Sequence, residues 1–296
     1  MNTPVIGVIG GSGLYEIDIL KNQKWIEVET PWGDPSDAIL AGEINGMEFK
    51  FLPRHGRGHV HSPTSVPYRA NIDALKQLGV TDIISISACG SFRDEMEPGD
   101  FVIVDQFIDR TVNREKSFFG PGCVAHVSMA YPVCQRLATV CKSASEAIGV
   151  NTHPKGTYLA MEGPQFSTLS ESRLYRDVWK CDVIGMTNMP EAKLAREAEI
   201  CYSTIAMVTD YDCWHPNHGE IDIEKLLGVL QKNTMRASEL ILKIPDLIGT
   251  ERPPCSKGCD RVLDYSILTP PPMRSQKVTE KLSTIMKRVQ SSPKGS

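Results

Sequence analysis

The sequence predicts a single α/β domain in which a mixed β-sheet is flanked by helices. Short apolar runs alternate along the chain with amphipathic segments of helical period, the pattern of a mostly parallel sheet. An Asn-Gly pair between two strand-like runs adds an antiparallel hairpin. The 296 residues are 41% hydrophobic and 23% charged, so the chain can bury a large core and is not disordered.

The pattern of apolar residues predicts each strand and helix, and turn-forming residues predict where several of them end. The first apolar run ends in Gly10-Gly11-Ser12-Gly13, which indicates a strand entering a tight turn, and Asn45-Gly46 separates the hairpin strands. Gly79 and Gly149 each follow an amphipathic segment and are expected to end a helix. The expected strands are Val5–Ile9, Ile39–Leu40, Met47–Leu52, Asp82–Ser87, Phe101–Val104, Gly156–Met161, Val183–Met186 and Tyr202–Val208. The expected helices are Tyr68–Leu78, Pro132–Ile148, Leu169–Trp179, Glu191–Glu199 and Ile221–Ile244.

Composition divides the chain into a body and an arm. Residues 1–250 are expected to form the catalytic domain, whereas residues 251–296 combine a Pro-rich segment with a basic, weakly amphipathic tail. We expect this arm to pack on or near the active site.

Charge and cysteine usage exclude several classes of protein. The net charge of −4 argues against a nucleic-acid binder, and no run of apolar residues is long enough to span a membrane. The N-terminus lacks the pattern of a signal peptide, so a cytoplasmic location is expected, with the nucleus as a second location. The nine cysteines are scattered, and the closest pair is Cys255 and Cys259, so we expect core cysteines rather than a zinc ribbon or disulfide framework.

Two segments have the chemistry of an anion site. The glycines around Ser12 could direct backbone N–H groups at a phosphate, although the segment is neither a P-loop nor a dinucleotide fingerprint, and a plain turn is the alternative. Arg54-His55 lies in a stretch without acidic residues, where a guanidinium beside an imidazole could clamp phosphate. A solvated basic loop is the alternative, and a zinc site of His55, His59 and His61 is a weaker one because the spacing is not standard.

Other candidates follow the ends of predicted strands. Ser87-Ala88-Cys89 offers small residues where open α/β sheets bind ligands, with ordinary strand termination as the alternative. In Asp210-Tyr211-Asp212, two nearby carboxyl groups and partial burial would raise a pKa and provide a general acid, whereas a turn, a helix cap or a metal-binding pair are the alternatives. Phe166 could stack on a flat heterocycle, although core packing is the default interpretation of a single Phe.

Taken in order, these motifs resemble one family. The chain from about Ile6 to Leu268 is similar to S-methyl-5′-thioadenosine phosphorylases, the adenine-selective branch of the trimeric purine nucleoside phosphorylases. The motifs that carry the resemblance are Gly10-Gly11-Ser12-Gly13-Leu14, Arg54-His55-Gly56, Ala88-Cys89-Gly90-Ser91, Glu162-Gly163-Pro164-Gln165-Phe166-Ser167, Met186-Thr187 and the segment from Met207 to Trp214.

The resemblance implies a nucleoside phosphorylase-like fold and a reaction. Such enzymes cleave the N-glycosidic bond of methylthioadenosine with inorganic phosphate, giving adenine and 5-methylthioribose 1-phosphate in methionine and purine salvage. The resemblance also implies that phosphate is bound by Ser12, Arg54, His55, Ser87, Ala88 and Thr187. It implies nucleoside binding by Phe166, Ser167, Met186, Asp210, Asp212, Ile223, Leu226, His126 and Leu268, with Asp210 as the general acid at purine N7.

The same resemblance bears on selectivity and assembly. Ser167, Asp210 and Ile223 stand where the 6-oxopurine branch has Glu, Asn and His, so methylthioadenosine is expected to exceed adenosine, and both to exceed inosine. His126 and Leu268 are expected to complete the 5′ pocket from a neighbouring subunit of a homotrimer. Ser12 and Ser87 replace expected Thr residues, which keeps adenosine open as a substrate.

No cofactor or metal is expected beyond phosphate as co-substrate. A phosphorylase acting on adenosine or on inosine and guanosine is the alternative enzyme, and a non-catalytic nucleoside-binding protein is the alternative from another class.

Overall fold

The computed structural model describes residues 3–11, 14, 20–216 and 223–291, without the side chains of residues 223, 225, 226 and 291. Ser12 therefore lies outside the described residues, as do the side chains of Ile223 and Leu226.

The centre of the sheet brings several strand ends to one edge. Strands β1 (Ile6–Gly10), β5 (Asp82–Ser91) and β11 (Cys201–Asp210) run parallel, with β5 between the other two. Strand β10 (Val183–Gly185) pairs antiparallel with the carboxyl end of β5. The mixed sheet predicted from the sequence is confirmed. Its remaining strands are β2 (Lys21–Ile26), β3 (Ile39–Ile44), β4 (Met47–Pro53), β6 (Phe101–Ile103), β7 (Gln106–Asp109), β8 (Thr152–His153) and β9 (Thr157–Ala160).

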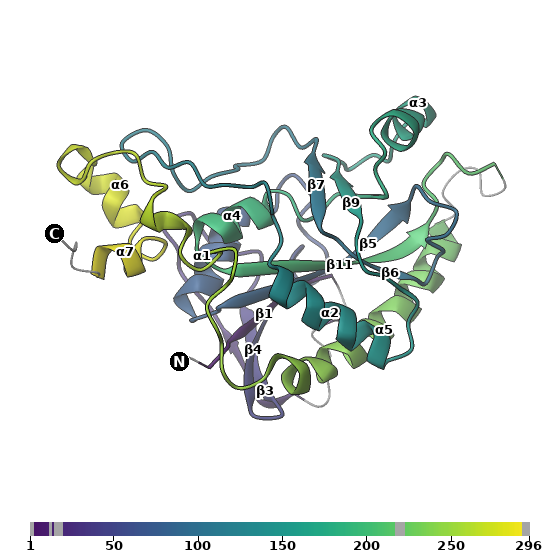
Figure 1. Ribbon diagram of the computed structural model, residues 1–296, viewed down its shortest axis with the longest axis horizontal. Coiled ribbons are helices and arrows are strands. Elements are labelled where there is room, and N and C mark those ends of the chain that lie inside the picture. The colour runs from purple at the N-terminus through teal and green to yellow at the C-terminus, as the bar shows by residue number, and fades with distance from the viewer. Residues whose placement is uncertain (1–2, 12–13, 15–19, 217–222, 292–296) are drawn as a thin grey trace.

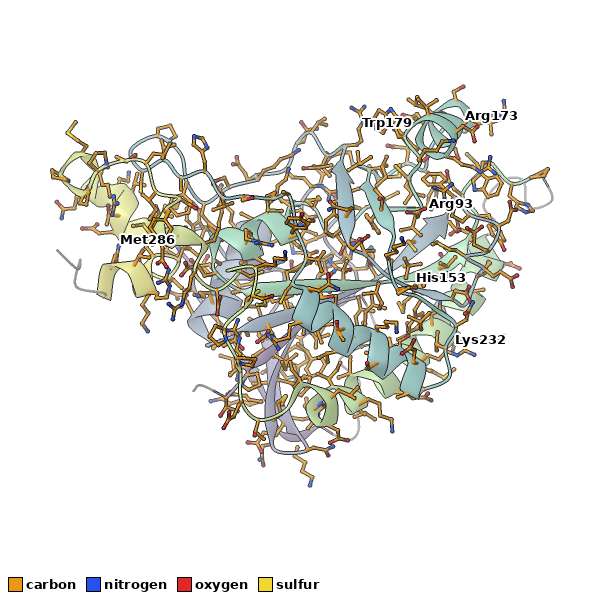
Figure 2. All side chains as sticks on the ribbon, in the orientation of Figure 1. Arg93, His153, Arg173, Trp179, Lys232 and Met286 are labelled. Carbon is orange, nitrogen blue, oxygen red and sulfur yellow. The ribbon has the colours of Figure 1, made fainter. Side chains whose placement is uncertain are left out.

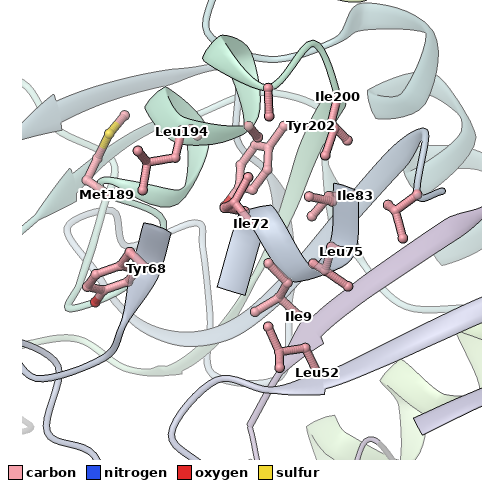
Figure 3. Packing of buried hydrophobic residues seen from close by; sticks show 14 of the residues in the cluster. Ile9, Leu52, Tyr68, Ile72, Leu75, Ile83, Met189, Leu194, Ile200 and Tyr202 are labelled. Atoms are coloured by element: carbon pink, nitrogen blue, oxygen red, sulfur yellow. The ribbon is translucent and has the colours of Figure 1, made fainter. Parts of the chain in front are cut away.

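Helices cover both faces of this sheet (Figure 1). Helices α2 (Gln135–Ala147) and α5 (Ile223–Ile248) pack together on one face, and α1 (Tyr68–Gln77) and α4 (Glu191–Glu197) pack on the other. Figure 3 shows Ile72 and Leu75 of α1 beside Ile83 of β5 in one of the buried clusters. Burial of these apolar faces stabilises the fold, at roughly 25 cal/mol per Å² of apolar surface removed from water.

The Asn-Gly hairpin forms as predicted. β3 and β4 are joined at Asn45-Gly46, whose φ angles are +49° and +78°. Two consecutive residues with positive φ are what a type I′ turn requires, and Asn followed by Gly supplies them at least strain.

The sequence pattern fails where an element has no apolar periodicity. β2 was not predicted, because Lys21-Asn22-Gln23-Lys24 is an exposed, polar strand at the sheet edge. The predicted helix Leu169–Trp179 is instead a short α3 (Leu169–Arg173) followed by a π-helical turn, Leu174–Val178.

The C-terminal arm contains short helices, α6 (Gln276–Lys281) and α7 (Lys287–Ser291). Leu282, Ile285 and Met286 are buried, and the Lys281 ammonium lies over the Trp32 ring. Figure 2 places Met286 near one end of the molecule and Arg173 near the other. Among the described residues of this single chain, none of the arm lines the cavity described below. No described helix combines the length and the apolar character needed to cross a membrane.

Candidate active site

A cavity of about 370 Å³ opens at the carboxyl ends of β5 and β11, beside β10. Most of the residues singled out from the sequence meet there although they are far apart in the chain. The predicted residues that line it are Arg54, His55, Ser87, Ala88, Phe166, Met186, Thr187, Asp210 and Asp212.

Arg54 is held by the protein far more tightly than a solvated basic loop would be. Its guanidinium is buried and binds Glu191 through Nε (2.5 Å) and Nη2 (3.3 Å). It also donates to Ser85 Oγ (2.7 Å) and to the Ile9 and Ile86 carbonyls. Burial opposes the charge, but the Glu191 carboxylate outweighs it and raises the pKa of Arg54. Arg54 is therefore a permanently charged, fixed wall of the cavity.

Glu191 had no signal in the sequence. It lies 137 residues from Arg54 at the start of α4, and an acidic residue in a first helical turn is common. Its role becomes visible only when the fold brings α4 over the end of β4.

His55 is neutral near pH 7. Its Nδ1 lies 2.8 Å from the His61 carbonyl oxygen, which fixes the hydrogen on Nδ1 and leaves Nε2 as an acceptor. Burial first, and then the Arg54 charge, lower the pKa of His55 to about 4.

Ser87 and Thr187 form a hydroxyl chain at the cavity wall. Thr187 Oγ1 donates to Ser87 Oγ at 2.9 Å, and Tyr158 Oη lies 2.9 Å from Thr187 Oγ1. With Thr187 donating to Ser87, Tyr158 donates to Thr187, and the Ser87 hydrogen is left to point at a ligand. The pair therefore presents one ordered donor to an anion.

Asp210 owes its position to an irregularity in β11. The pairing with β5 shifts register between Val208 and Asp210, and a bulge of this kind redirects a side chain. The carboxylate then accepts from Thr209 Oγ1 and from the Asp212 backbone N–H, each at 2.8 Å. Gly90 leaves it room, because a Cβ there would lie 2.9 Å from Asp210 Oδ1.

Burial is the main cause of the shifted pKa values of both carboxyl groups. It raises the pKa of Asp210 against the two hydrogen bonds, and it raises the pKa of Asp212, with the Asp210 charge adding to the latter. The raised pKa values agree with the prediction, but burial rather than repulsion between the two carboxyl groups is the larger cause for both residues.

The remaining lining is apolar or aromatic. Phe166 is 51% exposed and faces the cavity with Met186, which is the setting of a stacking surface rather than of a core Phe. Ser167 does not line the cavity itself. Its carbonyl oxygen accepts from Cys213 Sγ at 3.5 Å, so it lies at the edge, next to Asp212.

Cys89, considered as a nucleophile, is unsuited to that role. Burial, with the Asp210 charge second, raises the pKa of its thiol well above the ordinary value. A buried neutral thiol is a poor nucleophile.

His126 and Leu268 lie together, away from this cavity. His126 N–H donates to the Ser266 carbonyl, and Leu268 N–H donates to the Val124 carbonyl. His126 lines a separate cavity of about 410 Å³, and Leu268 is 60% exposed. Within one subunit they therefore do not contribute to the pocket around Asp210.

Comparison with known proteins places the chain in a superfamily and then in a family. The model of the phosphorylase superfamily matches residues 5–244. S-methyl-5′-thioadenosine phosphorylase from Cereibacter sphaeroides is 64% identical over 96% of this chain and 98% of the relative, and that from Rhodospirillum rubrum is 55% identical over 97% of each. A solved methylthioadenosine phosphorylase from an antarctic soil metagenomic library superposes with a TM-score of 0.90 at 46% identity, covering 96% of this chain and 99% of that one.

The chain belongs to the S-methyl-5′-thioadenosine phosphorylase family within the phosphorylase superfamily. The resemblance drawn from the ordered motifs is thereby confirmed.

Proposed function

We propose that this protein is a pentosyltransferase that cleaves 5′-methylthioadenosine with inorganic phosphate, releasing adenine and 5-methylthioribose 1-phosphate. Family membership supports the reaction and does not favour the alternatives of inosine phosphorolysis or binding without catalysis. The single observation that carries the chemistry is the geometry of the cavity. A partly buried carboxyl group, Asp210, lines the same cavity as a fixed cation, Arg54, and a hydroxyl pair.

Phosphate is assigned to the side lined by Arg54, His55, Ser87, Ala88 and Thr187. Arg54 provides a charge that does not titrate, and the Ser87 hydroxyl donates a hydrogen bond. Neutral His55 accepts the hydrogen of a monoprotonated phosphate at Nε2. Ser12 is proposed as a further donor from the glycine turn.

The purine is assigned to the side lined by Phe166 and Asp210. Phe166 stacks on the base, Met186 packs on the ribose, and Asp212 with Ser167 borders the purine edge. Ile223 and Leu226, at the start of α5, are assigned to the apolar 5′ group.

The reaction follows the charges. Breaking the glycosidic bond leaves positive charge on the ribose, as in glycoside hydrolysis, and the phosphate oxygens stabilise that charge before one of them bonds to C1′. The electron pair of the broken bond goes to the base. Burial raises the pKa of Asp210, which favours its protonated form, and the protonated carboxyl group gives its proton to N7, so adenine leaves as a neutral molecule.

The proposal includes a homotrimer in which His126 and Leu268 of one subunit complete the 5′ pocket of a neighbouring subunit. Their position outside the pocket of their own subunit supports this arrangement. Mixing subunits carrying Asp210→Asn with subunits carrying His126→Ala tests it, because a shared site regains activity in mixed trimers. No regained activity, or a monomer by light scattering, would overturn the assembly.

The direct test is adenine release from methylthioadenosine with and without phosphate, with inosine in parallel. We expect release that depends on phosphate, and no turnover of inosine. Turnover of inosine would overturn the base-pocket assignment, and binding without turnover would overturn the catalytic one.

A further inference from the structure

Four cysteines gather at the amino end of β11, far from the candidate active site. Cys201 begins β11, Cys134 is the N-cap residue of α2, and Cys255 and Cys259 come from the segment after α5. Their Sγ atoms all lie within 4.8 Å of one another, and all four residues are buried. The expectation that the cysteines are core residues is confirmed for these four, and although they are scattered along the sequence, the fold brings them together.

We infer that Cys134, Cys201, Cys255 and Cys259 form a structural zinc site. Four thiolates around one ion are typical of closed, structural zinc sites. With Zn–S bonds of about 2.3 Å, the sulfurs of a tetrahedron are about 3.8 Å apart. The Sγ atoms of Cys134 and Cys255 are 3.7 Å apart, which matches that edge. A disulfide would need roughly 2.05 Å and would pair the sulfurs rather than gather four of them.

The segment that supplies two of the ligands is folded as a compact turn. Cys255 and Cys259 are separated by three residues, within the usual two to four between paired zinc ligands. Gly258 N–H donates to the Cys255 carbonyl at 2.8 Å, and Gly258 has a φ of +67°, which suits glycine. Cys255 N–H donates to Asp260 Oδ2 at 3.3 Å, which closes the turn a second time, and the two Sγ atoms lie within 4.8 Å of each other.

The surroundings suit a negatively charged thiolate centre. Arg252 Nη2 lies 3.2 Å from Cys201 Sγ, so a guanidinium donates to one of the sulfurs. The same guanidinium binds the buried Asp82 carboxylate at 2.8 Å, and Arg136 of α2 binds Asp82 from the other side. Hydrogen bonds from neighbouring residues to metal ligands hold the ligands in place and stabilise their charge.

The position of the cluster gives the ion a structural role. Cys201 and Asp210 lie at opposite ends of a ten-residue strand, roughly 30 Å apart at about 3.3 Å per residue. The ion would join the start of α2, the start of β11 and the first part of the C-terminal arm, which holds Cys255 and Cys259. Zinc has no redox chemistry, which suits a site without access to substrate. Binding releases the four thiol protons to solvent and breaks no covalent bond.

The test is the metal content of the full-length protein, purified without chelator under reducing conditions from zinc-supplemented cells. We expect one zinc per chain by elemental analysis. Cys255→Ala and Cys259→Ala should each reduce zinc by at least tenfold. Cys181→Ala is the matched control, because Cys181 is buried outside the cluster, and it should keep the zinc. A cobalt-substituted protein should show thiolate-to-cobalt charge transfer and the visible bands of a tetrahedral site.

Several outcomes would overturn the site. These are metal-free protein under those conditions, iron in place of zinc, zinc retained in both cluster variants, or a disulfide between cluster cysteines in the freshly isolated protein. Zinc removal is expected to lower Tm and to leave kcat for methylthioadenosine within about twofold, so failure of the zinc site and failure of the proposed reaction are separate results.

Discussion

The two ends of β11 differ in how their polar groups meet solvent: those at the amino end are enclosed, and those at the carboxyl end line a cavity. At the amino end, four sulfurs lie close enough to share one ion and are enclosed by α2 and the segment after α5. At the carboxyl end, Asp210 and Asp212 line a cavity, and a bulge turns Asp210 into it. One strand thus connects a buried cluster of four cysteines with a pair of carboxyl groups that face a cavity.

Burial stabilises the structure at the amino end of β11 and adjusts an acid for chemistry at the carboxyl end. A closed thiolate cluster satisfies all its ligand atoms with one ion, so it gains stability and exposes nothing to substrate. At the carboxyl end, partial burial removes water from Asp210 and raises the pKa of its carboxyl group. Burial thus disfavours the ionised form of Asp210, and in the proposed reaction the protonated form transfers its proton to the base.

The largest effect is expected from Asp210→Asn. Loss of the proton donor should lower kcat by about 10²–10⁴, with a smaller change in KM for methylthioadenosine. Because protonated Asp210 is the active form in this mechanism, wild-type kcat should fall as pH rises through the pKa of Asp210. The variant should lack this fall in kcat. Steady-state adenine release across pH measures both.

Asp212→Asn is the matched comparison for that variant. Asp212 is also buried and has a raised pKa, but the proposed mechanism gives it no proton to transfer. An equal loss of kcat in both variants, or unchanged kcat in Asp210→Asn, would contradict the assignment of the acid.

The next effect concerns the ion pair between Arg54 and Glu191 at the wall of the cavity. Glu191→Ala would leave the Arg54 guanidinium buried and uncompensated, which should lower the free energy of unfolding by about 3–5 kcal/mol. Asp37→Asn removes an ionised partner from the half-exposed Arg57 and should cost at most about 1 kcal/mol. Denaturant titration of both variants measures the difference, and equal losses would show that the Arg54 pair is not a structural anchor.

Gly90→Ala should act through Asp210 without touching its chemistry. The new Cβ would lie 2.9 Å from Asp210 Oδ1 and 3.3 Å from the Asp212 nitrogen, so the carboxyl group must move. Displacement of a catalytic group by about 1 Å can cost up to roughly 100-fold, and we expect a 10- to 100-fold fall in kcat. Gly228→Ala, at an exposed helical position with open space around it, is the control and should keep full activity.

How far the sequence predicts this molecule depends on how local each signal is. Asn45-Gly46 is sufficient for a hairpin because the turn is made by those two residues alone. The polar strand β2 gives no such signal, since pairing with β3 rather than burial makes it a strand.

The candidate site shows the same limit. Arg54, Ser87 and Asp210 follow strand-like runs, and the carboxyl ends of neighbouring parallel strands meet, so their assembly could be predicted. The partners that adjust them could not, because Glu191 and Gly90 act across long stretches of chain. The cysteine cluster was missed for the same reason, as Cys134 and Cys255 are 121 residues apart.

The smallest effect is expected from the ionisation of His55. Its pKa of about 4 means that the ring gains a charge only as pH falls through that value, so it stays neutral across the working range. The ratio of kcat/KM for phosphate between wild type and His55→Gln should then change by less than about twofold from about pH 5.5 to 8.5, whereas an ordinary pKa near 6.5 would bend it strongly. Rates at saturating methylthioadenosine and limiting phosphate measure this ratio. A bend near pH 6.5 would show that His55 titrates in the working range, and the cavity would then hold an ionising imidazole in addition to the carboxyl groups of Asp210 and Asp212.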